Sequence, residues 1–100
     1  MCGIVSTVNH SDEVVHDMLL QIEHRGRDNR EIFESGNVHL GHNRLSINDV
    51  SEAGNQPFVW NDYALVVNGE IWNYPQLRKE YEERGYTFFS NGDSEIILYL

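Results

Sequence analysis

Apolar residues near the start of the chain follow two different spacings, separated by a short polar break. In residues 3–9 they lie among small residues, which is typical of a buried strand. Ser11, Asp12 and Glu13 then supply a capping residue and two acids, which favour the start of a helix. The helix that we expect carries apolar residues at helical spacing up to the segment His24-Arg25-Gly26, namely Val14, Val15, Met18, Leu19 and Ile22.

The middle of the chain alternates between short apolar segments and turn residues, which is typical of hairpins. Residues 31–33 and 37–45 are predicted strands around a Ser35-Gly36-Asn37 turn. Within the second strand, Val38 and Leu40 alternate with polar neighbours, so we expect one solvated face. Residues 48–57 are a predicted loop, and a hairpin follows over residues 58–60 and 63–67.

The last part of the chain predicts two helices and a strand. Pro75 suits a first helical turn, and Gly85 lies where a C-terminal cap is expected. Residues 86–89 are a predicted strand, and Asp93 or Ser94 is expected to cap an apolar helix over residues 95–100. That helix stops without a cap, so we expect the natural chain to continue past Leu100. Strands outnumber helices, which predicts an α+β fold.

The composition of the chain argues against several classes of protein and of binding partner. The 7 basic and 16 acidic residues give a net charge of −9, which argues against a partner that is a nucleic acid or an anionic membrane. A hydrophobic content of 40% excludes a disordered acidic tail, and a single cysteine excludes an intrachain disulfide. There is neither a membrane-span pattern nor a signal-peptide pattern, so we expect one acidic, soluble, cytoplasmic domain.

The single cysteine is the second residue, Cys2. An idle thiol at this position is the simpler interpretation, because unreactive cysteines are common. A small second residue also favours removal of Met1, which would leave an α-amino group on Cys2. That amine has a reference pKa near 7.7–8.0, so its neutral form can act as a base beside the thiol. The residues alone leave both interpretations open.

The five histidines show no metal-binding spacing, and we assign no metal to this chain. His39 and His42 are three positions apart in a predicted strand, so their side chains should lie on opposite faces of the sheet. We expect His24 and His42 to make structural hydrogen bonds.

Six short motifs occur in an order that resembles a known family. They are Met1-Cys2-Gly3-Ile4, His24-Arg25-Gly26-Arg27-Asp28, residues 41–47 (GHNRLSI), Gln56-Pro57, residues 68–73 (NGEIWN) and residues 93–98 (DSEIIL). Together they resemble the N-terminal glutaminase domain of class II glutamine amidotransferases, which are N-terminal-nucleophile hydrolases. Within that group the chain most resembles the glutamine-hydrolysing asparagine synthetases.

The resemblance implies a fold and a set of roles. The fold would be the N-terminal part of an αββα sandwich, and residues 1–100 would be the first part of a longer glutaminase domain. Cys2 would be the nucleophile, and Asn68 and Gly69 would form the oxyanion hole. The substrate glutamine would be bound by the remaining matched positions: Arg44, Leu45, Ser46, Ile47, Asn48, Glu70 and Asp93.

Taken individually, these residues also have ordinary structural interpretations. Arg44 could be a surface cation, Asn68-Gly69 a hairpin turn, and the two acids solvated side chains. The chain also departs from the family pattern, with Arg27 in place of proline and Trp72 in place of tyrosine. The loss of the proline puts the rigidity of the loop around Arg27 in doubt, because proline fixes φ.

The resemblance further implies that ammonia released from glutamine passes to a synthetase domain in the same longer chain. No cofactor is expected in these residues, whereas ATP and Mg²⁺ are implied for that second domain. Asparagine synthesis from aspartate is the favoured overall reaction, and a homodimer is compatible with it. Two alternatives stay open: an amidotransferase of an aminosugar or purine pathway, and a catalytically silent interaction module of the same fold.

Overall fold

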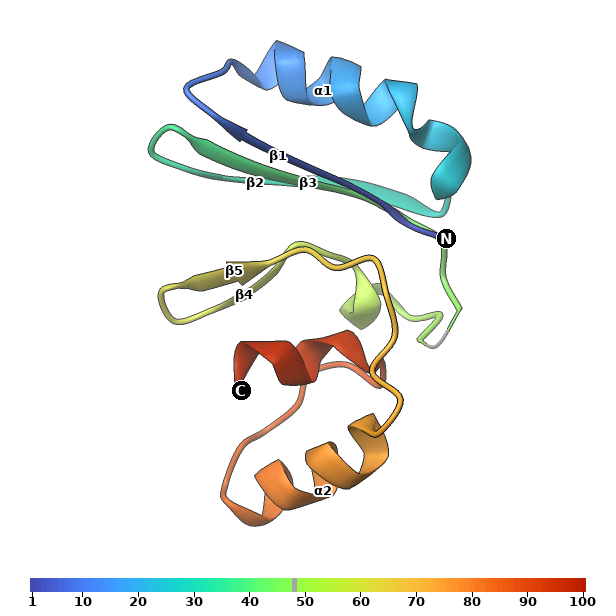
Figure 1. Ribbon diagram of the computed structural model, residues 1–100, viewed down its shortest axis with the longest axis vertical. Helices are drawn as coiled ribbons and strands as arrows, with labels where there is room; N and C mark the ends of the chain where they lie inside the picture. Colours follow the sequence, from blue (N-terminus) through green and yellow to red (C-terminus); the bar gives the residue numbers. More distant parts are fainter. Residues whose placement is uncertain (48) are drawn as a thin grey trace.

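A computed structural model describes residues 1–47 and 49–100. Its elements are stacked in layers (Figure 1). Helix α1 (Asp12–Gln21) lies on a three-stranded sheet, and the hairpin of β4 (Phe58–Trp60) and β5 (Tyr63–Leu65) faces the other side of that sheet. The short helix η3 (Ser94–Leu98) and helix α2 (Tyr74–Glu83) lie beyond the hairpin. Strands and helices are mixed along the chain, so the predicted α+β class is confirmed.

The three-stranded sheet is antiparallel, with β3 (Val38–Arg44) between β1 (Gly3–Val8) and β2 (Asn29–Ser35). Helix α1 covers one face of it through Val15 and Leu19, which are fully buried. The Asn43 side chain donates a hydrogen bond of 2.7 Å to the Leu19 carbonyl, which fixes the helix to the central strand. This layer confirms the predicted first strand, first helix and hairpin.

The exposure of side chains in the three-stranded sheet differs from the prediction, because helix α1 covers only one of its two faces. In β1 buried and exposed residues alternate, so Ile4 and Val8 are 46% and 55% exposed, and the expected buried strand is half-buried. In β3 the polar His39 is buried on the α1 side, whereas the apolar Val38 and Leu40 are half-buried on the other face. Every residue of β3 is buried or half-buried, so the solvated face predicted for this strand is absent.

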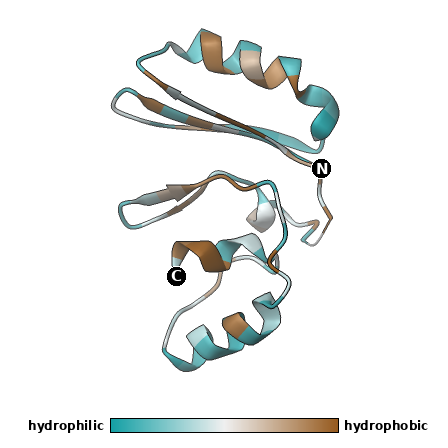
Figure 2. Ribbon diagram, in the orientation of Figure 1, coloured by the Kyte–Doolittle hydropathy of each residue, from teal (hydrophilic) through white to brown (hydrophobic). Residues whose placement is uncertain are grey.

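A second hydrophobic core lies between the hairpin and η3. Phe58, Ile96, Leu98 and Tyr99 are its buried members. The Tyr99 ring is surrounded by aromatic rings, with centroid distances of 4.9 Å to Trp60, 5.2 Å to Tyr86 and 5.1 Å to Phe88. In Figure 2, η3 is hydrophobic toward the C-terminus, whereas α2 is mostly hydrophilic with one apolar band. Burial of η3 against these rings holds the C-terminal half together.

Two elements of the C-terminal half differ from the prediction. Residues 86–89 form no strand, and the segment expected as a helix over residues 95–100 is the 3₁₀ helix η3. The cause of the missing strand is the Glu95 carboxylate, which is fully buried and accepts hydrogen bonds from the Phe89 and Ser90 amides, the Ser90 hydroxyl and the Tyr99 hydroxyl. Because these backbone donors bond to a side chain, they are not available to a neighbouring strand.

Other boundaries follow the prediction more closely. Helix α2 begins one residue before Pro75, and Gly85, with φ of +97°, ends it as predicted. Neither Ser11 nor Asp93 caps its helix through its side chain; the Asp93 carboxylate accepts the Ile71 amide instead, at 2.7 Å. No helix in the described part of the chain is both long and apolar enough to cross a membrane.

Truncating Leu19 tests the first core. In the natural protein that carries these residues, Leu19→Ala should lower the free energy of unfolding by about 2–5 kcal/mol, because Leu19 is fully buried. The matched variant Leu20→Ala alters the next helix residue, which is 51% exposed, and should change it by no more than about 0.5 kcal/mol. Denaturant unfolding followed by circular dichroism compares them. Equal effects would contradict the described packing of α1.

Candidate active site

Most of the predicted site residues line one cavity of about 350 Å³. They come from the N-terminus, the end of β3, the segment after β5 and the turn before η3, and they are Cys2, Arg44, Leu45, Ile47, Asn68, Gly69, Glu70 and Asp93. Ser46 does not line the cavity, because its amide donates to the Asp28 carboxylate at 2.7 Å. Asn48 lies outside the described residues. A second hollow, of about 600 Å³, follows α2 and contains none of the predicted residues.

Cys2 lies immediately before β1 and is partly exposed at the cavity. The Leu45 amide donates to its sulfur at 3.3 Å, and the sulfur lies 3.6 Å from the Leu45 carbonyl oxygen. The Arg25 guanidinium donates to the Cys2 carbonyl at 3.0 Å. The backbone of Leu45, expected to bind substrate, therefore also holds the thiol in place.

Arg44 is the last residue of β3, and its side chain is buried beneath the loop that follows. Its Nη1 donates to the Ser51 carbonyl at 2.6 Å and to the Asn55 Oδ1 at 2.8 Å. Gly54 lies so close that a Cβ there would be 2.2 Å from the Arg44 Nη2. The loop thus fits closely around the guanidinium.

The Arg44 guanidinium has a charged neighbour in the buried Asp49 carboxylate, because the charge of Arg44 contributes to the lowered pKa of Asp49. It donates its hydrogen bonds to neutral groups, the Ser51 carbonyl and the Asn55 side chain. Arg44 is only 6% exposed and lines the cavity, so a carboxylate that enters the cavity could also bind to it.

Asp93 and Glu70 also line the cavity. The Asp93 carboxylate, 5% exposed, binds the amide of Ile71, the residue that follows Glu70, and so joins the two acidic segments. Glu70 is exposed. With Asp49, the cavity lining combines the Arg44 cation with three carboxylates, so it offers charges of both signs, which a zwitterion requires.

Asp49 is a site residue for which the sequence offered no signal. It is buried, lines the cavity and accepts hydrogen bonds from the Ser51 amide and hydroxyl and from the Asn91 amide. These bonds, chiefly that from the Ser51 hydroxyl, hold the pKa of the Asp49 carboxyl below its ordinary value. Asp49 thereby fastens the loop around Arg44 to the turn that carries Asp93.

Asn68 and Gly69 follow directly on Val67, whose peptide groups are bound by two buried side chains. The Gln56 Oε1 accepts the Val67 amide at 2.6 Å, and the His42 Nε2 lies 3.3 Å from the Val67 carbonyl oxygen. The structural hydrogen bond expected for His42 is therefore confirmed, whereas His24 lies exposed in the short helix η1 (Glu23–Arg25). Gln56 was noted in a motif, but without a role.

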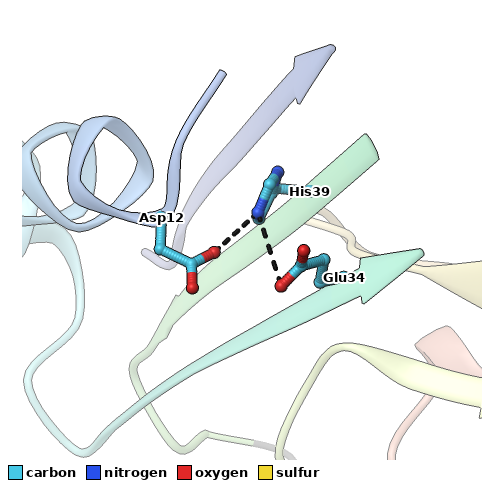
Figure 3. A group of neighbouring side chains, drawn as sticks. All are labelled: Asp12, Glu34 and His39. Carbon is cyan, nitrogen blue, oxygen red and sulfur yellow. Dashed lines mark hydrogen bonds and ion pairs between the residues drawn. The ribbon is translucent and has the colours of Figure 1, made fainter. Parts of the chain in front are cut away.

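On the face of the sheet that α1 covers, a separate cluster combines Asp12, Glu34 and His39 (Figure 3). One ligand atom from each lies within 4.8 Å of the others, and the His39 Nε2 is 2.6 Å from Asp12 and 3.7 Å from Glu34. Both carboxylates are exposed, and the short contact is an ordinary hydrogen bond between the start of α1 and β3. The predicted opposite orientation of His39 and His42 is confirmed, and the cluster is separate from the cavity.

Comparison with known proteins identifies the family of this chain. The sequence model of the glutamine amidotransferase domain matches residues 1–100. The chain is 48% identical over 109 residues to asparagine synthetase B (glutamine-hydrolyzing) of Escherichia coli, covering all of this chain and 19% of that one. It is 41% identical over 108 residues to asparagine synthetase (glutamine-hydrolyzing) 1 of Bacillus subtilis, covering 98% of this chain and 17% of the relative.

The chain thus spans about a fifth of the length of the curated relatives that it matches. The family match nevertheless extends along all described elements and includes every residue placed around the cavity. The chain belongs to the glutamine amidotransferase domain family.

Proposed function

We propose that this domain hydrolyses the side-chain amide of glutamine through a thioester on Cys2 and supplies the ammonia to a synthetase domain. The observation that carries the proposal is the cavity that joins the Cys2 thiol, the buried Arg44 guanidinium and the carboxylates of Glu70 and Asp93. The names of the relatives favour asparagine synthesis from aspartate and ATP as the overall reaction.

Glutamine is complementary to this cavity in charge. Its α-carboxylate can bind the Arg44 guanidinium, which can donate two parallel hydrogen bonds to a carboxylate. Its α-ammonium can bind the carboxylates of Glu70 and Asp93. The side-chain amide then extends toward Cys2 and the Asn68-Gly69 segment. Leu45 and Ile47 border the pocket, and Ser46 and Asn48 stay proposed neighbours of the substrate.

The first chemical step needs the α-amine of Cys2, which removal of Met1 would free. The amine takes the thiol proton, and the thiolate attacks the amide carbon of glutamine. The Asn68 side-chain amide and the Gly69 N–H stabilise the resulting oxyanion. The protonated amine gives its proton to the leaving nitrogen, the C–N bond breaks, and ammonia leaves a γ-glutamyl thioester on Cys2.

The second step reverses these proton transfers. The neutral amine takes a proton from water, and the hydroxide attacks the thioester carbon while the same donors stabilise the oxyanion. The C–S bond then breaks, the sulfur regains its proton from the amine, and glutamate is released. Atoms balance over the two steps: glutamine and water give glutamate and ammonia.

The remaining expectations concern the longer protein. We propose that residues 1–100 are the N-terminal part of a longer glutaminase domain, and that their layers belong to an αββα sandwich. The order of the layers in Figure 1, helix, sheet, hairpin and helices, supports this fold. ATP and Mg²⁺ would bind to the synthetase domain, and no residue of this chain is assigned to them.

Replacing the nucleophile tests the reaction. In the full-length natural protein, Cys2→Ala should abolish glutamate release from glutamine, because no thiol remains to form the thioester. Synthesis with added ammonium salt in place of glutamine should continue at the wild-type rate, since that route bypasses the cavity. Glutamate release and asparagine formation are measured in parallel. Glutaminase activity in Cys2→Ala would overturn the proposal.

Replacing Arg44 tests how the substrate is bound. Arg44→Met should lower kcat/KM for glutamine by about 100-fold, mainly through KM, because it removes the charge that binds the α-carboxylate. Arg44→Lys should lose less, since it keeps the charge but not the two parallel hydrogen bonds. The matched control is Arg30→Met, because Arg30 donates to Asn43 outside the cavity lining.

A substrate change separates this role from a structural one. With a glutamine analogue that lacks the α-carboxylate, wild type and Arg44→Met should have nearly equal kcat/KM. If the variant loses as much with the analogue as with glutamine, the guanidinium supports the loop and does not bind the carboxylate.

A further inference from the structure

Side chains hold the backbone N–H and C=O of Val67, just after the end of strand β5. The hairpin pairs Phe58 with Leu65 and extends no further toward Val67. The Val67 amide instead donates to the Gln56 Oε1 at 2.6 Å, and its carbonyl accepts from the His42 Nε2 at 3.3 Å. Gln56 and His42 come from different segments, the loop before β4 and the strand β3.

Both side chains are rigidly placed. His42 is fully buried and Gln56 is 7% exposed, so neither can rotate away without leaving buried polar groups unpaired. Gln56 precedes Phe58, a buried member of the second core, while His42 belongs to the central strand of the first sheet. These two hydrogen bonds, called the Val67 clamp below, therefore connect the Val67 backbone both to the first sheet and to the loop before the hairpin.

The chemistry of His42 suits a fixed donor. Burial, and to a smaller extent the charge of Arg44, lower the pKa of His42 to about 4, so the ring is neutral at physiological pH. Because the Val67 carbonyl can only accept, the proton of the neutral ring must be on Nε2. The donor is thus constant at neutral pH, and it adds no second cation next to Arg44.

We propose that His42 and Gln56 are positioning residues that hold the Val67 backbone and thereby aim the Asn68 side chain and the Gly69 N–H at the oxyanion. This inference rests on the proposed function. The Val67 carbonyl belongs to the peptide unit that joins Val67 to Asn68, and the Val67 amide belongs to the preceding unit. Rotation of either unit displaces both donors. The two residues act through Val67 and do not touch the substrate amide.

The expected effect is on turnover and not on substrate binding. Removing an oxyanion donor lowers kcat by about 10²–10³-fold, and displacing the donors by part of an ångström should cost about 10–100-fold. The KM for glutamine should stay within about 3-fold, because Arg44 and Asp93 are held by other contacts. A purely structural role would lower stability and the fraction of folded protein, but not kcat per folded site.

The experiment uses the full-length natural protein with four variants. His42→Leu and Gln56→Met remove the donor and the acceptor, and His42→Gln keeps a neutral N–H donor. His39→Leu is the matched control, because His39 is an equally buried histidine of β3 on the opposite face of the sheet. Active sites are counted by alkylation of Cys2 with iodoacetamide, followed by mass spectrometry of the N-terminal peptide. This alkylation forms no oxyanion, so its rate should be the same in all variants.

We expect kcat per counted site to fall about 10–100-fold in His42→Leu and in Gln56→Met, with His42→Gln recovering to within about 5-fold of wild type. The kcat per site of the double variant His42→Leu/Gln56→Met should be little lower than that of either single variant, because both side chains act through the backbone of Val67. His39→Leu should lose stability but keep wild-type kcat per site.

Three results would overturn the clamp while leaving the proposed function intact: unchanged kcat per site in both variants, a rise in KM alone, or an equal loss in His39→Leu. A wild-type protein that releases no glutamate from glutamine would instead overturn the proposed function, and the clamp would then have no oxyanion hole to position. Hydrogen exchange at the Val67 amide reports the clamp directly, and should be faster in Gln56→Met than in wild type. Unchanged exchange would contradict the described hydrogen bond.

Discussion

The arrangement of the site depends on one buried charge, the Arg44 guanidinium at the end of the central strand. Its strand fixes where the charge lies, and the loop over residues 49–55 is shaped to cover it, with Gly54 allowing the closest approach. The buried Asp49 carboxylate is near enough for the charge of Arg44 to contribute to its lowered pKa. The protein thus keeps a buried cation in a cavity with a thiol, where it can bind an anionic group.

The other walls of the cavity are irregular segments held by side chains instead of by strand ladders. Asp49 binds the loop around Arg44 to the turn at Asn91, Asp93 binds the Ile71 amide, and Glu95 binds the backbone of Phe89 and Ser90. Each carboxylate accepts backbone N–H groups that no strand satisfies. The high acidic content thus has a structural use in part, because buried acids fasten the loops that carry the site.

The sequence predicted the regular layers well because local patterns determine them. The apolar spacing of Val15 and Leu19, the Gly36 turn and the cap at Gly85 placed α1, the first hairpin and α2 nearly where they lie. It failed for residues 86–89, because the buried Glu95 carboxylate binds backbone donors that a strand would need, and a carboxylate in the sequence gives no sign of being buried. The half-buried first strand was missed because spacing does not show how many faces a neighbouring helix covers.

For the site, the family motifs identified residues that the chain brings together from distant segments, such as Cys2, Arg44 and Asp93. They could not identify the residues that hold these in place. Asp49 and Gln56 act through hydrogen bonds to backbone groups far away in sequence, and such pairing depends on the tertiary structure. Ser46 illustrates the converse, since a matched motif position binds Asp28 and lies outside the cavity lining.

The most direct test of this account is a crystal structure of the full-length Cys2→Ala protein with glutamine bound. The α-carboxylate should lie on the Arg44 guanidinium with two hydrogen bonds, the α-ammonium between Glu70 and Asp93, and the side-chain amide next to Ala at position 2. Glutamine bound with its carboxylate elsewhere, for example at Arg78 and Lys79 in the hollow along α2, would contradict the account.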